Sequence, residues 1–133
     1  MTEKVDPIKL HKDANALMEN GKYAEARDLF SKSADLYYKN QNYFGSAEMT
    51  YKAGECSFRL KEYEKAVEFY TKAADVSFAK GFDRYGTSAL ENAMESHKIL
   101  GHTKEVDEIS KKLDVINKKN AEPEDESSFS VFS

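Results

Sequence analysis

Apolar residues recur every three to four positions through most of the chain, which is the spacing of one face of an α-helix. The clearest example begins at Tyr63, where the apolar positions are Ala66, Phe69, Tyr70, Ala73 and Ala74, with Lys65, Glu68 and Lys72 left for water. Alternation of apolar and polar residues, which indicates strands, is not convincing anywhere. The pattern predicts an all-α protein with six helices, at 7–20, 22–39, 43–60, 62–80, 83–100 and 103–118.

Residues with special backbone roles support several of these boundaries. Asp6 precedes Pro7, an order that suits an N-cap followed by the first helical position, where proline lacks only an amide that would be unpaired anyway. Gly21 and Gly101 follow two of the predicted helices, where a left-handed residue is expected. The caps therefore agree with the periodicity.

The pattern repeats with a period of 40 residues. The segment from Lys22 to Leu36 matches the segment from Glu62 to Val76 almost column by column. A second step of 40 places Thr103, Val106, Ile109, Lys112, Leu113 and Ile116 in the columns of Tyr63, Ala66, Phe69, Lys72, Ala73 and Val76. Such a period indicates a helical-repeat array, so we expect a right-handed superhelical stack of three antiparallel helix pairs whose last helix acts as a cap.

Small residues recur at one column of the repeat. Ala26 and Ala66 occupy equivalent places, each followed one turn later by an aromatic residue, Phe30 or Tyr70. We expect two helices to approach closely at each alanine, with the aromatic ring filling the adjacent space. The cluster Tyr37, Tyr38, Tyr43 and Phe44 is interpreted as core, with an exposed contact patch as the alternative.

Charge divides the chain into two parts. Of 24 acidic and 20 basic residues, four acidic and no basic residues lie within 121–133, so residues 1–120 are neutral overall. We therefore expect a helical domain over 1–120 and a disordered acidic tail over 121–133. The domain lacks a concentrated basic stripe, which argues against nucleic acid as a partner.

Composition also restricts the compartment and the chemistry. The single cysteine, Cys56, cannot form an intramolecular disulfide, and a small buried thiol is its expected role. Neither a signal peptide nor a run of about 20 apolar residues is found, so we expect a cytoplasmic protein without direct membrane insertion. No spacing typical of a metal site, a nucleotide loop or a catalytic constellation occurs, and we expect no enzyme activity, no cofactor and no metal.

Two short signatures identify a known repeat. Gly21-Lys22-Tyr23-x-x-Ala26-x-x-x-Phe30 and Lys61-Glu62-Tyr63-x-x-Ala66-x-x-x-Tyr70 resemble the tetratricopeptide repeat family over residues 7 to about 118. The standard repeat has about 34 residues. The period of 40 resembles the long-helix variant of soluble NSF attachment proteins, although those are longer and use basic surfaces that have no equivalent in this chain. The resemblance implies a concave surface, formed by the first helix of each pair, that receives a peptide or helix from a partner.

The resemblance also implies which columns face that surface. They are His11, Asn15 and Met18, then Tyr51, Glu55 and Phe58, then Glu91, Glu95 and Lys98, with Glu19, Glu48 and Arg59 in the neighbouring column. Family members that clamp a carboxylate tail present lysine and asparagine in the deeper columns. Glutamates occupy most of them here, which favours a basic, amphipathic segment docking as a helix in a groove. The alternative is that these glutamates are an ordinary solvated helix face.

The tail ends in a pattern of its own. Phe129, Val131 and Phe132 follow the acidic run and resemble a short linear motif for another partner; chance apolar residues in a disordered terminus are the alternative. We expect the tail to stay free for a separate partner and not to fold back into the glutamate-bearing groove of its own domain, because like charges would meet there and ordering the linking residues costs backbone entropy.

An adaptor that binds a protein partner is accordingly the leading hypothesis, as a monomer or a weak homo-oligomer. The alternatives are a self-assembling structural module and a membrane-trafficking adaptor similar to the attachment proteins.

Overall fold

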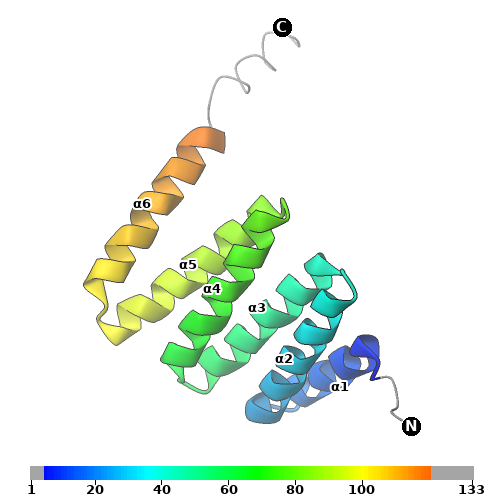
Figure 1. Cartoon of the computed structure of the whole chain (residues 1–133). Coiled ribbons are helices and arrows are strands. Elements are labelled where there is room, and N and C mark those ends of the chain that lie inside the picture. The colour runs from blue at the N-terminus through cyan, green and yellow to red at the C-terminus, as the bar shows by residue number, and fades with distance from the viewer. Residues whose placement is uncertain (1–4, 121–133) are drawn as a thin grey trace, which may run out of the picture.

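A computed structural model describes residues 5–120 of the 133-residue chain. These residues form six helices and no strand: α1 (Pro7–Glu19), α2 (Tyr23–Lys39), α3 (Tyr43–Arg59), α4 (Tyr63–Ala79), α5 (Asp83–Leu100) and α6 (Thr103–Asn120). Each helix packs antiparallel to the next in chain order, with α1 and α6 at opposite ends of the stack (Figure 1). The predicted all-α repeat stack is confirmed, and every predicted helix end lies within two residues of the observed one.

The helix ends follow the predicted chemistry. The side chain of Asp6 accepts a hydrogen bond from Ile8 N at 2.9 Å, and Pro7 is the first residue of α1. Gly21 and Gly101 adopt the left-handed conformation with φ of 75°. In addition, the side chain of Asn42 accepts a hydrogen bond from Gly45 N at 2.9 Å and caps α3, a cap that was not predicted from the sequence.

The five turns between helices share one geometry with a spacing of 20 residues. The left-handed positions are Gly21, Gln41, Lys61, Gly81 and Gly101, and the next residue in each turn donates its amide to the carbonyl five residues earlier. Lys22 N to Leu17 O at 2.9 Å and Phe82 N to Ser77 O at 2.7 Å are examples. Two helices and two such turns make one 40-residue unit, so the repeat is visible in the backbone as well as in the side chains.

The core is built mainly from alanines and aromatic rings. Ala26 and Ala66 are fully buried, as predicted for points of close helix approach, and Phe30 and Tyr70 are buried one turn later. One buried cluster joins α1, α2 and α3, and a second joins α4, α5 and α6. Ile109 and Leu113 bury the apolar stripe of α6 in the second cluster, as expected for the last helix of the stack.

The aromatic cluster at the turn between α2 and α3 is only partly core. Tyr37 is buried, whereas Tyr38 and Phe44 are about half exposed, at 49% and 46%. Phe44 stacks on Phe82 and Tyr85 with ring centroids 5.2 and 5.5 Å apart. The extended helices thus bury one ring of this group and leave others at the surface.

Within residues 5–120, no helix combines the length and the apolar character needed to cross a membrane.

Candidate binding surface

The predicted surface residues all lie on the first helix of each pair: His11, Asn15, Met18 and Glu19 on α1, Glu48, Tyr51, Glu55, Phe58 and Arg59 on α3, and Glu91, Glu95 and Lys98 on α5.

Tyr51 is the centre of this surface. Its hydroxyl lies 3.3 Å from Ser88 Oγ and accepts a hydrogen bond from the side-chain amide of Asn92, so it ties α3 to α5. Its ring packs against Tyr70 and Tyr85, with centroids 5.3 and 5.2 Å apart. Tyr51 is therefore a half-buried scaffold residue whose ring forms part of an aromatic floor.

Carboxylates from α3 lie close to this floor. Burial raises the pKa of Tyr85 well above its usual value of 10.0, and the negative charge of Glu48 and Glu55 raises it further. Burial likewise raises the pKa of Tyr70, with Glu55 as the next contribution. The two glutamates thus place negative charge beside neutral phenol rings.

The end of the surface at α1 has a different character. Asn15, Met18, Glu19, Tyr23, Lys52 and Arg59 line a shallow pocket of about 280 Å³. The Arg59 guanidinium lies over the Tyr23 ring, 5.7 Å from its centroid, and Lys52 Nζ lies 5.8 Å from the centre of Phe30. Two cations and an amide therefore meet here, beside a single glutamate.

Sequence reasoning missed Lys52 and Tyr23 in this pocket. Lys52 belongs to a stripe on α3 in which Glu48, Glu55 and Arg59 were already named, because positions 48, 52, 55 and 59 are spaced by three or four residues. This spacing was the sequence feature from which Lys52 could have been predicted to face the same surface. Tyr23 begins α2 and carried no such signal, since the contact depends on how α2 packs beside α1 and α3.

The sequence comparison agrees with this architecture. Residues 9–77, more than half of the chain, match the family model described as tetratricopeptide repeat. This chain belongs to the tetratricopeptide repeat family. A search of curated proteins returned no match. Tetratricopeptide repeats are in general scaffolds for protein–protein interaction, and the match does not distinguish the long-helix subgroup.

The remaining predicted surface residues of this tetratricopeptide repeat protein differ in how accessible their side chains are to a ligand. His11 Nδ1 lies 3.4 Å from the hydroxyl of Tyr37, which contributes to the core. Phe58 is half buried and stacks edge-on against Tyr63, with centroids 5.2 Å apart. Both side chains therefore already contact another side chain of the same domain.

Glu91, Glu95 and Lys98 are exposed on α5. No ion pair of residues 5–120 involves any of them, so Lys98 does not compensate the adjacent carboxylates. The structure brings Glu48 and Glu55 to the aromatic floor and leaves Glu91 and Glu95 in solvent.

Cys56 is fully buried on α3, and burial, followed by the charge of Glu55, raises its pKa from 9.0 to about 11. Its thiol is therefore protonated at neutral pH, which agrees with the predicted role of a small buried side chain. Among residues 5–120, no three His, Cys, Asp or Glu side chains are grouped as a metal site would require. Phe129, Val131 and Phe132 of the predicted tail motif lie outside the described residues.

Proposed function

We propose that this tetratricopeptide repeat protein is a cytoplasmic adaptor that binds a basic, amphipathic helix or peptide of a partner protein on the face formed by α1, α3 and α5. The observation that carries the proposal is that Glu48 and Glu55 lie three and four residues from Tyr51 on α3, on the helix face whose tyrosine ring packs against Tyr85. The tail motif at Phe129, Val131 and Phe132 is proposed to act apart from this face.

The chemistry of these groups suits a cationic side chain. A lysine or arginine placed over a tyrosine ring gains about 0.5–2 kcal/mol from the ring quadrupole, more as water is excluded. Carboxylates at the edge of the rings add an attraction that raises the association rate and selects against acidic ligands. Apolar contacts with Met18 and Phe58 would receive the other face of the ligand.

Isothermal titration calorimetry with designed peptides tests the proposal. A 16-residue peptide with leucines at helical spacing and lysines between them should bind, and binding should weaken as salt rises; the same peptide with glutamates in place of lysines should bind much more weakly. The double variant Glu48→Gln/Glu55→Gln should lose about tenfold in affinity, which is about 1.4 kcal/mol. The triple variant Glu55→Gln/Glu91→Gln/Glu95→Gln tests how much the exposed α5 glutamates contribute.

The matched control is Glu64→Gln/Glu68→Gln, which removes the same charge from the exposed side of α4. It should leave the affinity unchanged. Equal binding of the lysine and glutamate peptides, or equal losses in the two double variants, contradicts the proposal. Sedimentation of the unliganded protein over a concentration series separates it from the self-assembly alternative.

A further inference from the structure

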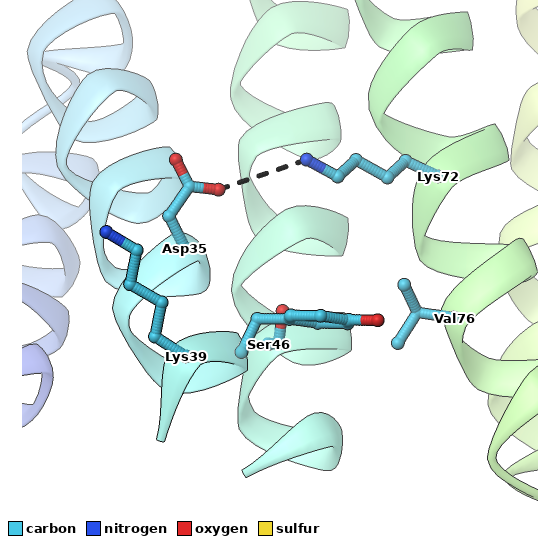
Figure 2. Close-up of a pocket in the computed structure, with 6 residues that line it drawn as sticks. Asp35, Lys39, Ser46, Lys72 and Val76 are labelled. Atoms are coloured by element: carbon cyan, nitrogen blue, oxygen red, sulfur yellow. Dashed lines mark ion pairs between the residues drawn. The ribbon is translucent and has the colours of Figure 1, made fainter. Parts of the chain in front are cut away.

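The 40-residue repeat builds the same groove twice on the second helices of the pairs. The first groove lies between α2 and α4, with a volume of about 430 Å³, and is lined by Asp35, Tyr38, Lys39, Ser46, Lys72 and Val76 (Figure 2). The second has a similar volume and is lined by Asp75, Phe78, Leu90, Lys111, Lys112, Val115 and Ile116, from α4, α5 and α6. Asp75, Phe78, Lys112 and Ile116 stand 40 residues after Asp35, Tyr38, Lys72 and Val76. The two grooves can therefore be compared position by position.

One difference lies in the groove floor. Ser46 of the first groove is replaced by Gly86 at the equivalent position, and a Cβ on Gly86 would come within 2.8 Å of Phe78 Cζ. The tip of the Phe78 ring therefore approaches the bare helix backbone at Gly86. Tyr38 faces a serine instead, and its ring is half exposed and stacks on Tyr43, with centroids 5.0 Å apart. The second groove also has an apolar floor of Phe78, Leu90 and Ile116, whereas Val76 is the one aliphatic residue that lines the first.

A second difference lies in the charges. Lys72 Nζ reaches across the first groove to Asp35 Oδ1 at 3.9 Å (Figure 2). The equivalent Lys112 and Asp75 form no ion pair with each other or with any other residue in 5–120. The last twelve residues of α6 hold four lysines and one aspartate. The second groove therefore combines an apolar floor with a rim of two lysines, of which Lys111 pairs with Asp107 at 3.2 Å and Lys112 has no ion pair in residues 5–120.

Residues 121–133 have the complementary chemistry. The segment contains four acidic residues and no basic residue, and all four acidic residues come before the apolar side chains Phe129, Val131 and Phe132. We propose that this segment does not stay free, as expected from the sequence, but binds in the groove between α4 and α6 of its own chain. The acidic run then lies at Lys111 and Lys112, and the aromatic rings lie on the floor formed by Phe78, Leu90 and Ile116.

The connection to α6 makes this geometry accessible. The segment follows Asn120 directly, and Val115 at the groove lies only about 8 Å back along the helix axis, at 1.5 Å per residue. Phe129 is the ninth residue after Asn120, which allows a reach of up to about 30 Å. Covalent attachment raises the effective concentration of the segment to about the millimolar range, so a low affinity of the groove for the segment is sufficient. The groove is separate from the face of α1, α3 and α5, where glutamates would repel the segment.

Amide NMR spectra of the full chain test the inference. Wild type is compared with Phe129→Ser/Phe132→Ser, which alters no residue of the six helices. The amides around Phe78, Leu90, Val115 and Ile116 should change position between the two proteins, equally at all protein concentrations. Lys112→Glu and Gly86→Ser should each move these signals toward the positions of the double variant. Lys72→Glu, the equivalent charge reversal in the first groove, should not.

Several results would overturn the inference. Unchanged groove amides in the double variant would show that the segment does not touch this surface. Changes that grow with protein concentration would assign the groove to a second copy, and changes centred on α1, α3 and α5 would place the segment on the opposite set of helices. Equal effects of Lys112→Glu and Lys72→Glu would remove the role of the cationic rim.

Discussion

The ring of Tyr70 in α4 lies directly on the backbone of Gly54 in α3, where an added Cβ would stand 2.9 Å from Tyr70 Cδ1. Alanine at position 54 therefore has to displace a buried aromatic side chain. The same ring stacks on Tyr51, so the displacement reaches the aromatic floor of the candidate surface.

Gly54→Ala should lower the free energy of unfolding by about 1–2 kcal/mol, because the overpacking cost exceeds the gain in helix propensity. Chemical denaturation measures the change. Combining it with Tyr70→Ala provides the control, since without the ring the alanine should become neutral or stabilising. A loss of the same size in both backgrounds would show that the close approach is not the cause.

Lys61 and Gln41 occupy the left-handed turn position that glycine holds at 21, 81 and 101, with φ of 62° and 64°. Lys61→Gly should stabilise the protein by about 1 kcal/mol because it removes the strain of a Cβ in that conformation. Gly81→Ala should destabilise it by a similar amount, and only through the backbone, since a Cβ there meets no atom within 4 Å. Thermal unfolding measures both changes. Lys61→Ala is the control and should bring no gain; if it stabilises as much as glycine does, loss of the lysine side chain is responsible.

Ser77 is fully buried in α4, and its hydroxyl has no hydrogen-bond partner among residues 5–120. Ser77→Ala should raise the free energy of unfolding by about 1 kcal/mol, because it removes an unsatisfied buried group. Ser57 is equally buried, but its hydroxyl donates to Ala53 O at 3.0 Å. Ser57→Ala is the matched control and should give no gain. Chemical denaturation of the two variants and the wild type measures the change in midpoint. Equal shifts for Ser77→Ala and Ser57→Ala would contradict the explanation.

His97 and His102 meet at the turn between α5 and α6 with their Nδ1 atoms 2.9 Å apart. Burial lowers the pKa of His97 below its usual value of 6.5, and the charge of His102 lowers it further, while Glu105 opposes the shift. Below pH 6.5 the unfolded chain therefore binds more protons at this site than the folded one. The resulting stability is present above pH 6.5 and is lost as the pH falls toward the lower pKa of the folded state.

His97→Gln should flatten the decline in melting temperature between pH 7.5 and pH 5. Scanning calorimetry at constant ionic strength measures this change. Parallel curves for the variant and the wild type would show that His97 makes no contribution to the acid sensitivity.

Local chemistry let the sequence alone determine the helices and their repeat. An apolar stripe, an Asp6 cap and a left-handed Gly21 all depend on residues within one or two turns of one another, and these are visible in the chain. The alanine columns likewise predicted two positions that are fully buried, because a small side chain that recurs in one column of a repeat suits a closely packed interface.

Only the tertiary structure decided which side chains meet. The column pattern grouped Glu91 and Glu95 with Glu55, yet packing leaves the first two exposed in solvent and places Glu55 beside buried tyrosines. Periodicity specifies the face of a helix but not its register against a neighbour, and that register brings Lys52 and Tyr23 into one pocket.

The two grooves show the same limit. Tyr38 and Phe78 are equivalent in the sequence, but the presence or absence of one Cβ, at Ser46 or Gly86, determines whether the ring stands at the surface or lies on the backbone. Such a choice depends on van der Waals contact between residues of different helices, and a periodic pattern carries no record of it.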